Sequence, residues 1–206
     1  MTYVPSSMPQ PDRAAASQFA REIGFGAVIG HTGGQYYSAH VPIFVELDDS
    51  GSASAIRFHF AEINEMVSAI GSALEVLVIV RGPDGYISPE WYDHENVPTW
   101  DYAIVQFIGR AEPIGEPALK RHLQELLEKF DPGSKISDAY IDKYLSSIRG
   151  FQVTAFSLEP VFKLSQDKNE ASVDGVIQGL TSRRELLDLA LVEEIEKTYK
   201  ATRDLK

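Results

Sequence analysis

The stretch YYSAHVPIFVEL, residues 36–47, carries the pattern that decides the fold class of this chain. Every second residue from Tyr37 to Leu47 is hydrophobic, and the residues between them are mostly polar. A period of two is typical of a β-strand that turns one face to a core. Pro42 has no N–H to donate to a neighbouring strand, so we expect this strand at a sheet edge or with a bulge.

Further strands and helices are predicted on both sides of this stretch. The strands are expected at residues 25–30, 56–60, 74–81, 99–110 and 151–166, with turns at 31–35 and 81–89. The helices are expected at residues 12–23, 64–73, 116–130 and 138–148, and Ser182 with Glu185 matches the capping box of a last helix. Strands dominate the first half and helices the second, which indicates an α+β protein whose antiparallel strands form a small barrel.

The length of 206 residues favours a single domain, residues 1–206. We expect residues 1–113 and 150–166 to supply the barrel strands. Residues 114–149 and 167–206 would then be helical additions, so the additional helices are mostly C-terminal.

The composition excludes several classes of function. The chain has no cysteine, which excludes thiol catalysis, cysteinyl metal sites and iron–sulfur clusters. Its 30 acidic residues against 19 basic ones give a net charge of −11, so direct DNA binding is not expected. Residues 1–13 lack the apolar core of a signal peptide, and no apolar run spans a bilayer, so we expect a cytoplasmic protein with no membrane association.

Both tryptophans lie in the loop WYDHENVPTW, residues 91–100. Because this segment has neither strand nor helix periodicity, we interpret its aromatic residues as part of a ligand pocket or a subunit interface. The alternative is a small hydrophobic cluster under the loop. Asp93, His94 and Glu95 are not interpreted as a metal site, because consecutive residues seldom converge on one ion.

The strand at residues 56–60 is expected to place Phe58 and its apolar neighbours in the core and to turn Arg57 and His59 the other way. These two basic side chains could hold a phosphate. Alternatively, Arg57 forms an ion pair with Glu46 across the hairpin. Two further histidines, His40 and His122, are expected to have no role, since His122 lies on a helix among charged residues.

Several ordered blocks extend this interpretation along the chain: AHVPI (39–43), HFAEIN (59–64), residues 76–110 with YISPEWY and VPTW, IRGFQV (148–153), KLSQDK (163–168) and GVIQGL (175–180). With these blocks the chain resembles the PaiB-type family of FMN-binding negative transcriptional regulators. That family belongs to the split-barrel flavoproteins, which are related to pyridoxamine phosphate oxidase.

The resemblance implies an antiparallel FMN-binding split β-barrel that forms a homodimer, with FMN in a groove between subunits. His59 and Asn64 fall in the family segment that borders the flavin phosphate, and Lys163 falls in a late block that closes over the groove. The cofactor-binding candidates are Arg57, His59, Asn64, Arg81, Ser88, Trp91, Thr99, Trp100, Lys163 and Gln166.

One residue departs from the family pattern. Glu62 stands where the family usually has arginine, and a phosphate prefers arginine's fork to a carboxylate. The resemblance therefore implies weaker FMN binding here, unless Arg57 or Arg81 compensates. We expect a regulator that acts indirectly, through flavin or a partner. An FMN-dependent oxidoreductase, a ligand-free dimer and a haem-binding split barrel remain the alternatives.

Overall fold

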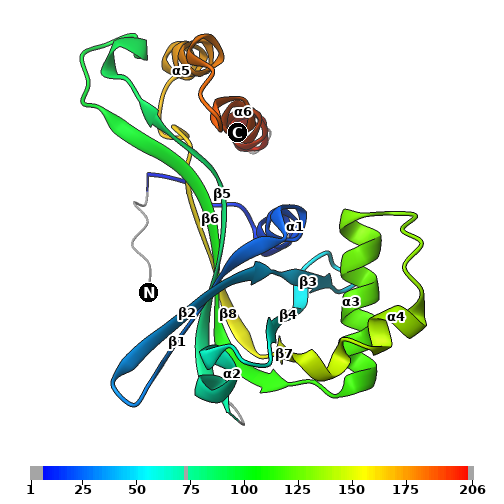
Figure 1. Cartoon of the computed structure of the whole chain (residues 1–206). Coiled ribbons are helices and arrows are strands. Elements are labelled where there is room, and N and C mark those ends of the chain that lie inside the picture. The colour runs from blue at the N-terminus through cyan, green and yellow to red at the C-terminus, as the bar shows by residue number, and fades with distance from the viewer. Residues whose placement is uncertain (1–6, 72–73, 204–206) are drawn as a thin grey trace. The chain divides into compact units, whose positions relative to one another are not determined.

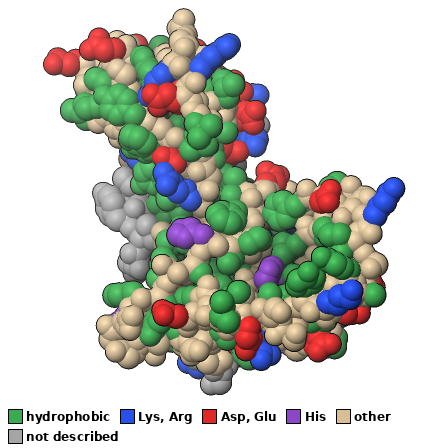
Figure 2. Space-filling view, viewed as in Figure 1, with side chains coloured by type: hydrophobic (Ala, Val, Ile, Leu, Met, Phe, Trp, Pro, Cys, Tyr) green, Lys and Arg blue, Asp and Glu red, His purple; other side chains and the backbone are tan. Residues whose placement is uncertain are grey.

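The computed structural model describes residues 7–71 and 74–203 (Figure 1). The chain forms two compact units. We call Met1–Asp12, Arg81–Val105 and Glu159–Lys206 the helical unit, and Arg13–Val80 and Gln106–Leu158 the barrel unit. On the face drawn in Figure 2, Lys and Arg side chains are scattered among Asp and Glu, in keeping with the net charge of −11.

The strands form one eight-stranded sheet in the order β2-β1-β5-β6-β7-β4-β3, with β8 paired to β6. Their bounds are β1 Phe25–Thr32, β2 Gln35–Pro42, β3 Phe44–Leu47, β4 Ala53–Ala61, β5 Leu74–Ile87, β6 Thr99–Pro113, β7 Ile148–Val153 and β8 Phe156–Lys163. Strand β1 pairs antiparallel with β2 and β5, and β7 pairs antiparallel with β4 and β6. The predicted α+β class with antiparallel strands is confirmed.

Helices belong to both units. The barrel unit holds α1 Arg13–Ile23, α2 Glu65–Ile70, α3 Glu116–Phe130, α4 Asp138–Asp142 and the short helix η2 Leu145–Ser147. The helical unit holds the short helix η1 Pro89–Trp91, α5 Glu170–Arg183 and α6 Asp188–Arg203. No helix in the described part of the chain is long and apolar enough to cross a membrane.

The barrel core lies against β4, as predicted. Phe58 and Phe60 are almost fully buried and contact Phe151 of β7, with ring centroids 6.2 and 5.7 Å away. The opposite face of β4 is covered by α3, which also packs Leu119 against Ile141 and Leu145. Both faces of β4 are therefore inside the barrel unit.

The strand predicted at residues 36–47 lies at sheet edges, as expected from Pro42, but it forms two strands and not one. Strand β2 ends at Pro42, which pairs with Phe25, and β3 begins at Phe44. Pro42 cannot donate to a ladder, and the fully buried Ile43 instead donates its backbone N–H to Gly24 at 2.8 Å. The proline therefore ends one strand and starts the next.

The predicted turn at residues 81–89 is wrong as well, because β5 continues to Ile87. Gly85 lies in the strand interior, and a Cβ added there would come within 3.0 Å of Leu191 in α6. The glycine therefore permits close packing of a helix on the strand and does not form a turn.

Three other predicted boundaries need correction. The helix expected at residues 138–148 divides into α4 and η2, and the strand expected at 151–166 divides into β7 and β8. Ser182 belongs to α5, which ends at Arg184 in a left-handed conformation (φ 55°). The capping interaction comes from Asp188, whose carboxylate accepts the Glu185 N–H at 2.8 Å.

We expect Phe58→Ala to lower the free energy of unfolding by about 3–5 kcal/mol, because it empties a ring-sized space in the barrel core. Urea unfolding followed by far-UV circular dichroism would measure the loss. Phe130→Ala is the matched control, since Phe130 is 54% exposed. Equal stability of the two variants would contradict this location of the core.

Candidate functional site

The ten predicted cofactor-binding residues divide between the two units. Arg57, His59 and Asn64 belong to the barrel unit. The other members belong to the helical unit: Arg81, Ser88, Trp91, Thr99, Trp100, Lys163 and Gln166.

Arg57 is buried on β4 and its guanidinium already has partners. It lies 2.5 Å from Glu125 of α3 and 3.3 Å from Glu46 of β3, above the ring of Phe44. The alternative pairing with Glu46 is thus present, and Glu125 adds a second carboxylate. With both carboxylates in place, the guanidinium serves to hold β3, β4 and α3 together.

His59 contacts His122, a histidine that was expected to have no role. Its Nδ1 lies 3.1 Å from Nε2 of His122, which is fully buried on α3, so the expectation that His122 lies among helix charges is wrong. Burial lowers the pKa of His59, and burial together with the charges of His59 and Arg57 lowers the pKa of His122 to about 3. The pair is therefore neutral at pH 7 and joins strand to helix.

Asn64 begins α2 by accepting the N–H of Met66 at 2.9 Å with its side-chain oxygen. The carboxylate of the neighbouring Glu62 lies 2.6 Å from Nε of Arg149. Residues 59–65 thus contain two carboxylates, Glu62 and Glu65. None of the three predicted residues in this unit presents an unpaired cation.

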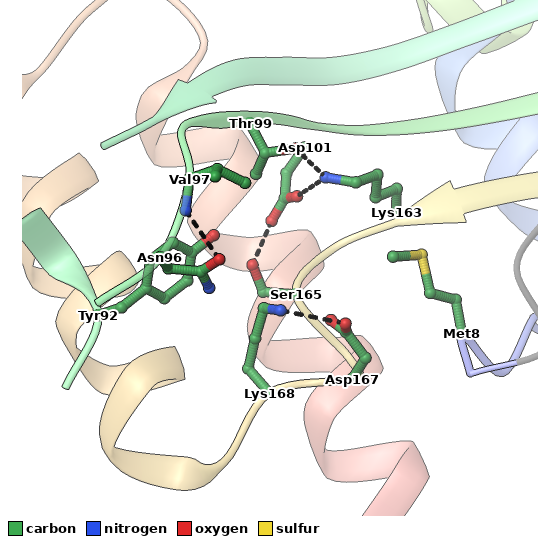
Figure 3. A pocket seen from close by; sticks show the side chains of 10 residues that line it. All are labelled: Met8, Tyr92, Asn96, Val97, Thr99, Asp101, Lys163, Ser165, Asp167 and Lys168. Carbon is green, nitrogen blue, oxygen red and sulfur yellow. Dashed lines mark hydrogen bonds and ion pairs between the residues drawn. The ribbon is translucent and has the colours of Figure 1, made fainter. Parts of the chain in front are cut away.

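The predicted residues Thr99 and Lys163 meet in a pocket of the helical unit, which we call the Lys163 pocket (Figure 3). The Lys163 Nζ donates to Thr99 Oγ1 at 2.6 Å, to the Trp100 carbonyl at 2.9 Å and to Asp101 at 3.2 Å. The ammonium group is therefore held in one position at the end of β8, beside the first residues of β6.

Asp101 is the buried anchor of this pocket. Its carboxylate has no exposed surface and accepts the Ser165 hydroxyl at 2.6 Å as well as the Lys163 ammonium. Burial raises its pKa, and the hydrogen bond from Ser165 and the charge of Lys163 oppose that rise. Ser165 has a left-handed backbone (φ 57°), a strained conformation for serine that directs its hydroxyl to Asp101.

Gln166 has a structural position next to the pocket. Its side chain accepts the Leu164 N–H at 2.6 Å and donates to the Phe162 carbonyl at 2.7 Å. Since both ends of the amide bind backbone groups of the same turn, Gln166 fixes that turn and, through it, Ser165.

The opposite wall of the pocket comes from the tryptophan loop. Tyr92 is buried, and Asn96 and Val97 follow it along the loop (Figure 3). Asp93 accepts hydrogen bonds from Ser172, His94 and Asn169, which hold the pKa of its carboxyl well below the usual range. These hydrogen bonds tie the loop to the start of α5. Among the residues that the structure describes, no group of three His, Asp or Glu side chains is placed to hold a metal ion.

The two tryptophans have different surroundings. Trp91 lies against α5, where a Cβ added at Gly179 would overlap its ring, and the Arg183 guanidinium is 5.2 Å from the ring centroid. It therefore fits the alternative of a small cluster under the loop. Gly179 belongs to the GVIQGL block. Because glycine has no side chain, it leaves a flat surface on α5, and it was the sequence signal for the contact with Trp91.

Trp100 is half exposed and firmly held. Its Nε1 donates to Asp84 at 2.8 Å, and Asp84 also pairs with Arg81 at 2.5 Å. Tyr86, 40% exposed, meets the Trp100 ring edge-on. Ser88 has a structural role, because it caps η1 by accepting the Glu90 N–H at 3.3 Å. Among the predicted cofactor-binding residues of this unit, Trp100 is the one with an exposed aromatic surface.

The Lys163 pocket suits a neutral, polar group that both donates and accepts hydrogen bonds. Lys163 and Lys168 are balanced by Asp101 and Asp167, with which they form ion pairs. An uncharged group that carries both hydrogen-bond acceptors and a donor fits this set better than a phosphate dianion does. The cavity measures about 100 Å³, whereas pockets that hold a whole ligand span about 300–1,000 Å³. The cavity therefore has room for only one end of a ligand of that size.

The comparisons with known proteins agree with this fold. Residues 2–156 match the family described as "Putative FMN-binding domain". The chain is 31% identical over 186 residues to "Protease synthase and sporulation protein PAI 2" of Bacillus subtilis, with 86% of this chain and 88% of that protein covered.

Two solved structures resemble the fold. The FAD and heme binding protein of Mycobacterium smegmatis matches with a TM-score of 0.57 at 15% identity, over 79% of this chain and 77% of that one. The flavocytochrome Anf3 of Azotobacter vinelandii matches with 0.56 at 13% identity, over 72% and 66%. The predicted split-barrel fold is confirmed.

We expect Gly179→Ala to destabilise the helical unit by about 1–3 kcal/mol, since the new methyl group would overlap the Trp91 ring. Helix propensity alone predicts the opposite sign, a gain of about 1 kcal/mol. Thermal unfolding of the variant decides between them, with the exposed neighbour Gln178→Ala as control. A stabilised Gly179→Ala protein would show that Trp91 does not pack here.

The buried histidine pair predicts that stability falls in acid. The folded-state pKa of His122, about 3, lies below the unfolded value of about 6.5, so its contribution is complete above pH 6.5 and is lost as the pH falls toward 3. Between pH 7 and 5, this group lowers the free energy of unfolding by about 2 kcal/mol. His122→Gln should lose this part of the pH dependence in urea unfolding, and the exposed His40→Gln should keep it.

Proposed function

Since the chain belongs to the FMN-binding domain family, we propose that it binds FMN, with the polar edge of the flavin ring in the Lys163 pocket. The observation that carries the proposal is this pocket of paired charges, whose wall from Tyr92 to Asp101 lies within the matched residues 2–156. Bound FMN would supply hydride and one-electron chemistry.

The residues of the pocket would bind and orient the ring. Lys163 and the hydroxyl of Thr99 face the cavity as a linked pair, and Ser165 is oriented by Asp101 (Figure 3). Tyr92 and Val97 would exclude water from the ring edge. Because Asp101 neutralises Lys163, the pocket would orient an uncharged group and leave the phosphate to other side chains.

A second copy of the chain would complete the site. The cavity is too small for the whole cofactor, and the half-exposed Trp100 lies with Tyr86 and the 70% exposed Val97 on the surface of the same unit. Aromatic residues are enriched in the buried centres of interfaces. We therefore propose a homodimer that buries this surface against the flavin.

The proposed role is indirect regulation of transcription. The Bacillus relative is named for protease synthase and sporulation, which favours a regulatory role. A net charge of −11 in each copy would slow approach to DNA and weaken nonspecific binding. A change in flavin state or a protein partner would then carry the signal.

The first experiment tests the cofactor. Purified protein should show flavin absorbance, or should quench added FMN, and Lys163→Gln should weaken binding about tenfold through loss of a charge-assisted hydrogen bond. Lys200→Gln, exposed on α6, is the charge-matched control. Asp101→Asn combined with Lys163→Gln avoids an unpaired buried carboxylate and separates weak binding from misfolding.

Three spectra would have different meanings. A haem spectrum would replace the FMN proposal with the haem alternative, and no retained chromophore at tens of micromolar FMN would leave the ligand-free dimer.

A mobility shift at physiological salt and nicotinamide-dependent flavin reduction then test the role. Tight, selective DNA binding would contradict indirect action, and rapid turnover lost in Trp100→Ala would favour the oxidoreductase.

A further inference from the structure

In the barrel unit, α2 lies beside the β1–β2 hairpin (Figure 1). Two open clefts lie between these elements. They measure about 380 and 410 Å³, within the range of about 300–1,000 Å³ that small ligands occupy. Tyr37 and Glu65 line both clefts, so the two join at these residues.

The charge of the clefts is negative. Among the described residues that line them, Glu65 is the one formally charged side chain, and no lysine or arginine occurs. The structure records no ion pair for Glu65 within residues 7–71 and 74–203, and its side chain is exposed. A carboxylate without a basic neighbour in the lining disfavours a phosphate and favours a cation.

Aromatic and apolar surfaces surround this carboxylate. Tyr36 is 75% exposed on the wall of the first cleft, and its ring is supported by His31 at 4.5 Å between centroids. Tyr37 lies between the clefts, with its hydroxyl directed to Gln35 at 3.3 Å. Ile63, 94% exposed, lines the second cleft beside Tyr37.

We propose that these clefts form a binding site for a small organic cation, an ammonium group on an apolar body. The ammonium group lies at Glu65 and against the tyrosine rings, which attract cations through their π faces. The apolar body lies along Ile63. None of the residues that line these clefts lines the Lys163 pocket.

The polar side chains just before Glu65 are already engaged. Glu62 forms an ion pair with Arg149. The oxygen of Asn64 caps α2. The carboxylate of Glu65 is therefore the acidic group at the clefts that can receive a cation.

Titration with 2-phenylethylammonium, followed by NMR or calorimetry at low salt, tests the site. We expect saturable binding of this amine and at least tenfold weaker binding of 3-phenylpropionate, which has a carboxylate in place of the ammonium. Glu65→Gln should weaken amine binding at least tenfold. Glu75→Gln, an exposed change of the same charge on β5, should bind like the unmodified protein.

Two further variants keep the test decisive. Glu65 lies in the first turn of α2, where a negative charge stabilises the helix. Glu65→Asp keeps the negative charge, so it checks that lost charge, and not a lost helix, weakens amine binding in Glu65→Gln. Tyr36→Leu should weaken binding while leaving the melting temperature unchanged. Unchanged amine affinity in Glu65→Gln, or equal affinity for the anion, would overturn the proposal, and FMN binding by Glu65→Gln is a separate readout.

Discussion

A buried arginine on β4 constrains how the elements of the barrel unit pack together. Arg57 is 7% exposed and requires carboxylates within reach, because an uncompensated buried charge costs about 3–5 kcal/mol. Glu46 meets this requirement from β3 and Glu125 meets it from α3. The helix must therefore lie over the polar face of β4, and this location also brings His122 to His59.

The sequence predicted the strands of the barrel unit well because their burial is local and periodic. Alternation assigned Phe58 and Phe60 to the core and also suggested the pairing of Arg57 with Glu46. Alternation could not predict the ion pair of Arg57 with Glu125, because that contact depends on which face of α3 covers the sheet. The spacing of Leu119, His122 and Leu126 along one helix stripe was a usable signal, because all three are buried.

In the helical unit, sequence reasoning found the polar residues of the pocket more readily than their arrangement. Thr99 and Lys163 belonged to recognisable blocks, and the structure brings them together. Asp101 was overlooked because a carboxylate in a β-rich run is expected at the surface, whereas here it is buried among donors. The glycines of residues 81–89 indicated a turn, although Gly85 instead makes room for α6.

The location of the two indole rings determines what an optical measurement on this chain can report. Both belong to the helical unit, one packed on α5 and the other half exposed beside Tyr86. Indole emission therefore reports on that unit alone, while the barrel unit contributes only phenylalanine and tyrosine signals. If the units lose structure at different denaturant concentrations, emission and backbone dichroism will give different midpoints, which is the signature of unfolding that is not two-state.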